Sequence, residues 1–176
     1  MPRWVALFSQ TGSEIVEIAE HLGVWPSRIL TNNNDLDKIN PKLHNKINIM
    51  SHNGIEETLE YMDEFTGTTI VTLHGYLRIL STRVCKTGLQ IYNGHPAYIS
   101  EYPELKGKDP QERTWENIEK YPLIGSTVHK VVAEVDSGEL EREWIVENTC
   151  TSKEEVYNTL RKTSLEAWLY FLKGKL

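Results

Sequence analysis

The N-terminal segment combines a short apolar run, a turn and an amphipathic segment, and this order constrains the fold more than any other feature of the chain. Residues 4–8 (WVALF) are apolar, and residues 9–12 form a polar stretch that ends in glycine. In the following segment the apolar positions have the spacing i, i+3, i+4, i+7 of one helix face: Ile15, Ile18, Ala19 and Leu22. A buried strand, a glycine-containing turn and a helix open an α/β unit.

The rest of the chain continues this alternation. Apolar or β-branched runs predict strands at residues 28–30, 47–50, 69–73, 89–92, 126–132 and 140–146. Apolar spacing predicts helices at residues 54–65 and 111–120. A Ser-x-x-Glu capping box at Ser152 begins a last helix, whose core-facing side chains are predicted to be Tyr157, Leu160, Trp168 and Phe171. We therefore expect one α/β domain over residues 1–176, with an open, mostly parallel twisted sheet, helices on both faces and some antiparallel pairing late in the chain.

Composition limits the classes of function. The 176 residues contain 19 Lys+Arg and 25 Asp+Glu, a formal charge of −6, which argues against broad binding to nucleic acid or to an anionic membrane. No segment is long and apolar enough for a signal peptide or a membrane span. Cys85 and Cys150 form no paired motif, which favours a reducing, cytoplasmic location. The histidines and cysteines have no ligand spacing, so no metal site is predicted.

The turn between the first strand and the first helix is a candidate anion site, because a helix N-terminus offers free N–H groups and a favourable dipole. Gly12 would allow close approach of a ligand, and Ser13 could cap the helix or bind a phosphate. An ordinary capped turn explains the same pattern equally well. Glu14 would repel a phosphate placed beside it.

A second candidate site follows the strand predicted at residues 89–92, since open α/β sheets bind ligands at the carboxyl ends of their strands. Asn93 can donate a hydrogen bond to a developing oxyanion, and His95 can move a proton near neutral pH. Asp136 follows a later strand and could orient such a histidine. A loop histidine with ordinary partners and a plain turn aspartate are the alternatives.

Three segments together resemble the folate-dependent formyltransferase family. Residues 73–81 (LHGYLRILS) are similar to its folate-site loop, and residues 93–96 (NGHP) are similar to its Asn-x-His-Pro motif. Residues 125–129 (GSTVH) and 135–138 (VDSG) resemble its Gly-Thr-Ser-Val-His and Asp-x-Gly region. The resemblance covers most of the chain and implies the Rossmann-like formyltransferase fold.

The resemblance also implies a reaction. The donor would be 10-formyltetrahydrofolate, with no metal, and the acceptor would be a primary amine. Asn93 and protonated His95 would stabilise the tetrahedral oxyanion, and Asp136 would hold His95 charged. The residues implied to surround the pterin are Leu73, Tyr76, Arg78, Ile79, Leu80, Ile91, Ala133 and Val135.

The implied acceptor is a small, phosphorylated or nucleotide-like metabolite, and glycinamide ribonucleotide is the best single candidate. The residues implied to contact it are Thr11, Gly12, Ser13, Glu14, Gly94 and Glu166. Three features depart from the family pattern. Glu14 stands where the family has asparagine, Gly94 replaces an apolar residue and would open space, and residues 104–109 replace the family's loop. Lys106 and Lys108 in that loop could contact an anion or remain solvated.

Other functions within reach of this sequence remain open. An amino-sugar nucleotide could be the acceptor, or the chain could be a non-catalytic folate- or nucleotide-binding domain. The methionyl-tRNA formyltransferases, which resemble this domain, carry a further C-terminal domain, so tRNA is not the expected acceptor. The expected partners are therefore folate and a small amine, without nucleic acid or membrane, and a homodimer is one option for the assembly.

Overall fold

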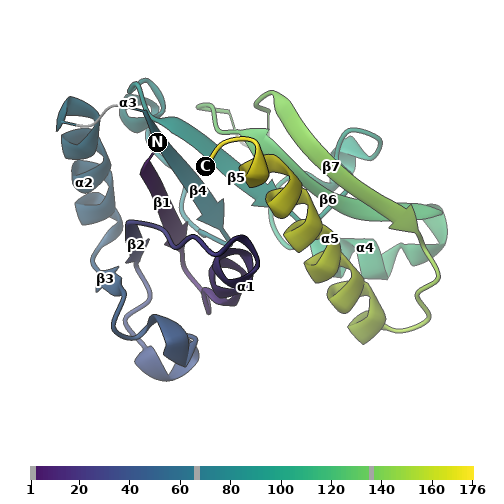
Figure 1. Cartoon of the computed structure of the whole chain (residues 1–176). Helices are drawn as coiled ribbons and strands as arrows, with labels where there is room; N and C mark the ends of the chain where they lie inside the picture. The colour runs from purple at the N-terminus through teal and green to yellow at the C-terminus, as the bar shows by residue number, and fades with distance from the viewer. Residues whose placement is uncertain (1–2, 66–67, 135–136) are drawn as a thin grey trace.

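The computed structural model describes residues 3–65, 68–134 and 137–176, and within them seven strands form one sheet in the order β3-β2-β1-β4-β5-β6-β7 (Figure 1). The strands are β1 (Arg3–Phe8), β2 (Arg28–Thr31), β3 (Ile47–Ile49), β4 (Thr69–His74), β5 (Gln90–His95), β6 (Leu123–Lys130) and β7 (Leu140–Glu147). Neighbouring strands from β3 to β5 are parallel, whereas β5–β6 and β6–β7 are antiparallel. The predicted mostly parallel sheet is confirmed.

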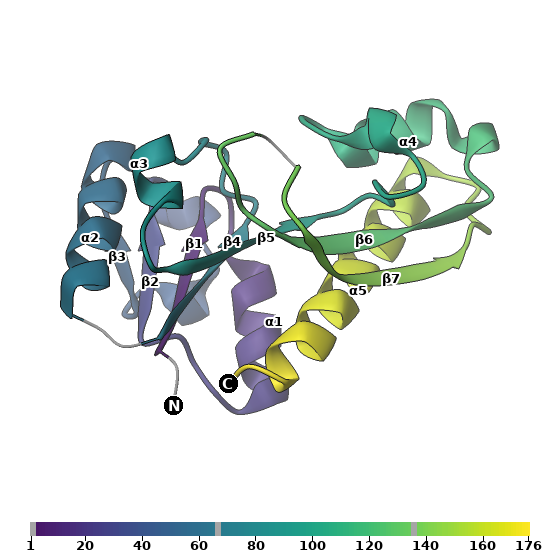
Figure 2. The ribbon, with the colours of Figure 1, turned by 90° about the horizontal axis from the view of Figure 1, so that it is seen from above.

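Helices cover both faces of this sheet, as predicted. The helices are α1 (Ser13–Leu22), α2 (His52–Phe65), α3 (Thr82–Cys85), α4 (Pro110–Glu116) and α5 (Lys153–Lys173). Figure 2 shows α1 and α5 beside one another, and their buried side chains form one core cluster. The buried residues of α2 and α3 form a second cluster on the opposite face. A third cluster joins α5 to the segment that leads from β5 to β6.

Strand β1 occupies the middle of the parallel part, between β2 and β4. Trp4, Ala6 and Phe8 pack in the α1–α5 cluster, and Val5 and Leu7 pack in the α2–α3 cluster. Because successive side chains of a strand point to opposite faces, a strand covered on both faces is apolar at every position. The unbroken apolar run at residues 4–8 has this physical cause.

Two local predictions are wrong. The helix predicted at residues 111–120 ends earlier, because Asn117 leaves helical geometry at φ −126° and a short 3₁₀ turn, Ile118–Lys120, follows. Tyr157 is 39% exposed and donates a hydrogen bond to Glu112 on α4 (2.9 Å) instead of entering the core. The first turns of α5 pack against α4, which provides this carboxylate partner for the phenol.

The described part of the chain contains no helix with the length and apolar character needed to cross a membrane. What the fold provides for function is the edge of the sheet where β1, β4 and β5 end, at Phe8, His74 and His95. Ligands of open α/β sheets bind at such an edge.

Candidate active site

Asn93 and His95 lie at the carboxyl end of β5, and the pairing of β5 with β6 sets which residues accompany them. Asn93 is opposite His129, and His95 is opposite Thr127. Directly opposed residues of an antiparallel pair project from the same face, so these four side chains share one face of the sheet. The sequence segment at residues 125–129 (GSTVH) contains His129, but only the strand register brings His129 opposite Asn93.

The ring of His95 is buried and has a fixed orientation. Its Nε2 lies 2.8 Å from the carbonyl oxygen of Leu105. Because a carbonyl oxygen can only accept, Nε2 carries the proton in this contact. Asp136 and Val135 lie outside the described residues, so the pairing of Asp136 with His95 remains a prediction.

The predicted folate loop, residues 75–81, follows β4 and presents an apolar surface at the same edge. Leu77 and Ile79 are each 67% exposed, whereas Tyr76 and Leu80 are buried. Arg78 lies between the two exposed side chains and is itself exposed. Leu73 and Ile91, predicted as walls of the pterin site, are buried in the α2–α3 cluster beneath the loop. Ala133, predicted on the other side of the pterin, is exposed.

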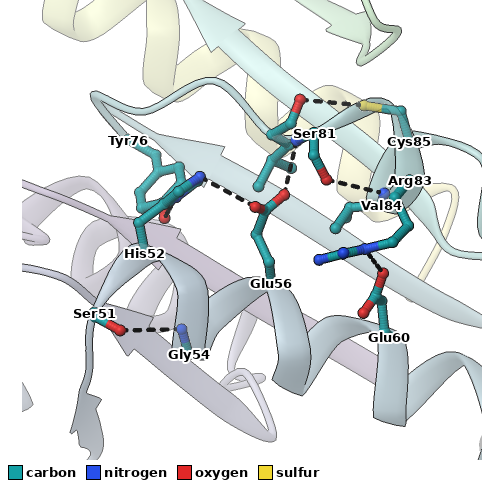
Figure 3. A network of polar contacts seen from close by, with 11 residues as sticks. Ser51, His52, Gly54, Glu56, Glu60, Tyr76, Ser81, Arg83, Val84 and Cys85 are labelled. Carbon is teal, nitrogen blue, oxygen red and sulfur yellow. Dashed lines mark hydrogen bonds and ion pairs between the residues drawn. The ribbon is translucent and has the colours of Figure 1, made fainter.

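Both ends of this loop are held by α2 (Figure 3). Glu56 accepts a hydrogen bond from the backbone N–H of Ser81 (2.7 Å), and His52 Nε2 lies 3.4 Å from the other Glu56 oxygen. His52 Nδ1 lies 2.6 Å from the hydroxyl of Tyr76. Burial raises the pKa of Tyr76 to about 12, so this hydroxyl stays protonated and can donate to His52. Contacts within the protein therefore anchor this loop to α2 at both ends.

Local packing and hydrogen bonds account for the residues of the turn after β1. Gly12 is the N-cap of α1 with a left-handed φ of 72°, and a Cβ there would lie 2.5 Å from Leu43. Ser13 does not cap the helix, contrary to one of the two sequence predictions for it. Its hydroxyl instead accepts hydrogen bonds from Thr11 (3.2 Å) and Asn40 (3.3 Å).

Glu14 points into the protein, and the expectation that it faces an acceptor is not met in this structure. Its two oxygens lie 2.7 Å from His74 Nδ1 and 2.6 Å from the Ser164 hydroxyl on α5. The other ring nitrogen of His74 contacts Thr72 (2.8 Å), which also accepts a hydrogen bond from the Trp4 indole (2.8 Å). Because both of its oxygens contact protein groups, Glu14 links the start of α1 to β4 and α5 through hydrogen bonds.

Gly94 does not open space, which corrects the second expectation about the acceptor. The indole of Trp168 lies against it, and a Cβ at residue 94 would be 2.4 Å from the indole nitrogen. Trp168 is fully buried and its ring centroid is 4.6 Å from that of His74. The indole nitrogen has no hydrogen-bond partner among the described residues. Glycine is required here because the tryptophan of α5 occupies the room that a side chain would need.

Glu166 is not brought to the site. It is exposed on α5, whereas Ser164 and Trp168 are on the buried face of that helix. Lys106 and Lys108 are exposed as well. The helical spacing of buried positions separates Glu166 from the face that packs on the sheet.

An open hollow of about 520 Å³ lies at the carboxyl ends of β1 and β2. Its lining residues are Ser9, Gln10, Thr11, Asn33 and Lys38. Of the predicted acceptor residues, only Thr11 lines it. The polar turn after β2 was the sequence signal that could have placed Asn33 and Lys38 here. The described residues contain no group of His, Cys, Asp and Glu side chains suited to a metal ion.

The fold and these motifs agree with a comparison to protein families. The family model described as formyl transferase matches residues 30–171, and the chain belongs to this family. The family predicted from the three sequence segments is confirmed. A comparison with curated protein sequences finds no significant match.

Solved structures of similar fold include phosphoribosylglycinamide formyltransferases. The enzyme from Campylobacter jejuni subsp. jejuni NCTC 11168 superposes with a TM-score of 0.81 at 23% identity, over 99% of this chain and 97% of that one. The enzyme from Streptococcus pneumoniae TIGR4 also has a TM-score of 0.81, at 19% identity, over 99% and 98%. A formyltetrahydrofolate deformylase from Pseudomonas syringae pv. tomato str. DC3000 has a TM-score of 0.76 at 18% identity, over 98% of this chain and 60% of that one. These likenesses confirm the predicted fold.

Gly94→Ala tests the packing of Trp168. The added methyl would overlap the indole nitrogen, and we expect a loss of about 1–3 kcal/mol in the free energy of unfolding, measured by urea denaturation. Gly54→Ala in α2 is the control, because it meets atoms only at 3.4 Å and beyond and should be neutral or stabilising by up to about 1 kcal/mol. Equal stabilities for the two variants would contradict the close packing.

Glu14→Ala tests the inward orientation of this carboxylate. Removing it leaves the buried His74 and Ser164 without a hydrogen-bond partner that they now share, and we expect a loss of about 1–3 kcal/mol in the free energy of unfolding. Glu20→Ala on the same helix removes only an exposed ion pair with Lys42 and should cost less than about 1 kcal/mol. If Glu14→Ala is as stable as Glu20→Ala, the carboxylate faces solvent instead.

Glu56→Gln tests the anchoring of the loop through its pH dependence. Burial raises the pKa of the Glu56 carboxyl, but hydrogen bonds from Ser81 and the charges of His52 and Arg83 outweigh it, so the pKa lies below its ordinary value of 4.5. A lowered folded-state pKa stabilises the protein above the unfolded-state pKa, and this stabilisation is lost as pH falls through the folded-state value. The stability difference between wild type and Glu56→Gln should therefore be constant above about pH 5.5 and shrink on acidification below it, in urea denaturation.

Glu57→Gln is the matched control for the loss of an exposed carboxylate on the same helix. A stability difference for Glu56→Gln that grows on acidification would contradict the lowered pKa.

Proposed function

We propose that this protein transfers a formyl group from 10-formyltetrahydrofolate to the primary amine of a small metabolite. The observation that carries the proposal is the position of Asn93 and His95 on one face of β5, with the protonated Nε2 of His95 held by Leu105. The fixed loop at residues 75–81 follows the neighbouring strand β4. Membership of the formyl transferase family supports the reaction class.

The loop at residues 75–81 suits a flat, partly apolar ring system such as a pterin. Leu77 and Ile79 offer exposed apolar side chains, and the anchors on α2 hold the backbone between them. A loop that protein contacts hold in place loses less conformational entropy on binding than an unanchored loop does. This arrangement supports the assignment of Arg78, Ile79 and Leu80 to the donor.

In the proposed reaction the amine nitrogen attacks the formyl carbon, and the carbonyl π electrons move onto oxygen. Asn93 and the Nδ1–H of charged His95 stabilise this oxyanion by donating hydrogen bonds, since the Nε2–H of His95 donates to Leu105, as preorganised donors do in other acyl transfers. The intermediate then collapses with cleavage of the bond to N10 of the folate, which takes up a proton while the former amine gives one up. We assign Asp136 the role of keeping His95 charged during this exchange.

The acceptor side is consistent with a phosphorylated or nucleotide-like amine, and glycinamide ribonucleotide is the first candidate. Glu14 is engaged by His74 and Ser164, so it does not present a free carboxylate to the turn at residues 9–12. The adjoining hollow contains the cationic Lys38 beside neutral polar side chains. The solved structures named phosphoribosylglycinamide formyltransferases support the same candidate. We place the reaction in the cytoplasm, with a homodimer as the assembly to test first.

The likeness to a formyltetrahydrofolate deformylase gives a second candidate, in which water replaces the amine. The test is to mix the purified protein with 10-formyltetrahydrofolate and a panel of amines, including glycinamide ribonucleotide and amino-sugar nucleotides. A mass increase of one formyl group identifies the acceptor. Formate release without an amine indicates the deformylase, and folate binding without turnover on any amine indicates a binding domain. Either of these last two results overturns the proposed transfer.

His95→Ala tests the catalytic role directly. We expect kcat to fall by about 10²-fold or more, since an oxyanion donor and proton-transfer group is lost. The dissociation constant of a formyl-dideazafolate, an analogue of the donor, should change by less than about twofold, because His95 is not assigned to the loop that binds it. His21→Ala on the exposed end of α1 is the control and should keep wild-type turnover. Substantial turnover by His95→Ala would refute the assignment.

A further inference from the structure

Arg113 on α4 binds the backbone of the loop that replaces the family's segment at residues 104–109. Its Nε donates to the carbonyl of Lys108 (2.8 Å), and its Nη2 donates to the carbonyls of Lys106 (2.7 Å) and Leu105 (3.1 Å). Its Nη1 donates to the carbonyl of Glu104. A guanidinium has five N–H donors in a rigid plane, and here one side chain binds four backbone carbonyls, two in the 3₁₀ turn Pro103–Leu105 and two in the loop that follows it.

This loop contains backbone conformations that need such support. Gly107 has φ 90°, and Asp109 has φ 52°, the only left-handed residue other than glycine in the described part of the chain. Left-handed conformations of non-glycine residues cost free energy and persist only where surrounding contacts impose them. Arg113 supplies contacts at Asp109, since its side chain binds the carbonyl of Lys108 and its backbone N–H donates to the carbonyl of Asp109 (3.1 Å).

The carbonyl of Leu105 links this arrangement to the active site. It accepts the hydrogen bond from Nε2 of His95 and the one from Nη2 of Arg113. The Leu105 side chain is buried beside Ala97 and Tyr121, so the residue is held from the core side as well. Any shift of the loop therefore moves the acceptor of the hydrogen bond from Nε2 of His95.

We propose that Arg113 is a positioning residue for His95. By fixing the Leu105 carbonyl, Arg113 keeps the Nε2–H of His95 in its hydrogen bond and keeps the ring in one orientation. The catalytic consequence rests on the proposed formyl transfer, in which His95 donates to the oxyanion. The effect on the histidine ring itself does not depend on the reaction.

The test compares Arg113→Met, which keeps the apolar stem and removes all donors, with Arg113→Lys, which keeps the charge and cannot bridge several carbonyls. Arg161→Met is the control, because Arg161 makes only an exposed ion pair with Glu17 (3.5 Å) in the described contacts. The first measurement is the ¹⁵N NMR spectrum of the histidine rings, with the His95 signals assigned from their loss in His95→Ala. Wild type and Arg161→Met should show His95 protonated at Nε2. Arg113→Met should show a mixture of tautomers or exchange-broadened signals.

The second measurement is turnover with the acceptor found in the amine panel. We expect kcat to fall at least about tenfold in Arg113→Met and less in Arg113→Lys, because small displacements of a catalytic group have effects of this size. The KM for the donor and the dissociation constant of the formyl-dideazafolate should stay within about twofold, which loss of the fold or of the donor loop would not allow. Arg161→Met should match wild type in every measurement.

Two results would overturn the proposal. One is wild-type His95 protonated only at Nδ1, which can be observed even if both Arg113 variants fail to fold. The other is a folded Arg113→Met with wild-type histidine signals and wild-type kcat. If the wild type transfers formyl groups to no amine, the proposed function fails, whereas the NMR comparison still decides the role of Arg113.

Discussion

The candidate active site depends on the pairing of β5, which is parallel to β4 on one side and antiparallel to β6 on the other. The parallel pairing brings the end of β5 to the edge where β1 and β4 also end. The antiparallel pairing sets His129 and Thr127 opposite Asn93 and His95. A shift of one residue in either pairing would turn every side chain of β5 to the other face. Asn93 and His95 would then point into the face covered by α5.

The loops around this edge share one physical solution. A loop that crosses a sheet edge has backbone groups without ladder partners, and these groups need hydrogen bonds when they are shielded from water. Glu56 binds the backbone of the loop at residues 75–81 from α2, and Arg113 binds the loop at residues 104–109 from α4. Each charged side chain is carried by a helix that packs on the rest of the protein. The helices therefore transmit the rigidity of the core to the two loops that flank Asn93 and His95.

On the opposite face of β5, Gly94, His74 and Glu14 belong to one set of mutually dependent contacts with α5 and its neighbours. Trp168 of α5 lies against Gly94, and its ring packs on His74. His74 contacts Glu14, and Glu14 accepts a hydrogen bond from Ser164 of α5. The sequence suggested that Gly94 opens space and that Glu14 repels a phosphate. Packing inside the protein explains both residues. These contacts leave open the polar hollow that Thr11 and Lys38 line.

Local pattern determined the elements that this protein forms. The apolar run at residues 4–8 and the helical spacing after it predict a buried strand and an amphipathic helix, because strand and helix periodicities depend on nearby residues alone. The Asn-x-His motif at the end of a strand identified the candidate catalytic pair for the same reason. Only the tertiary structure decided which way Glu14 points, what occupies the space over Gly94, that Glu166 stays in solvent, and that Arg113 reaches His95 through Leu105. Glu14, Gly94 and Glu166 depend on how α5 packs against α1 and against strands far away in the sequence, whereas Arg113 depends on how α4 packs beside the turn that contains Leu105. Packing and strand register set these contacts, and neither can be read from a local sequence pattern.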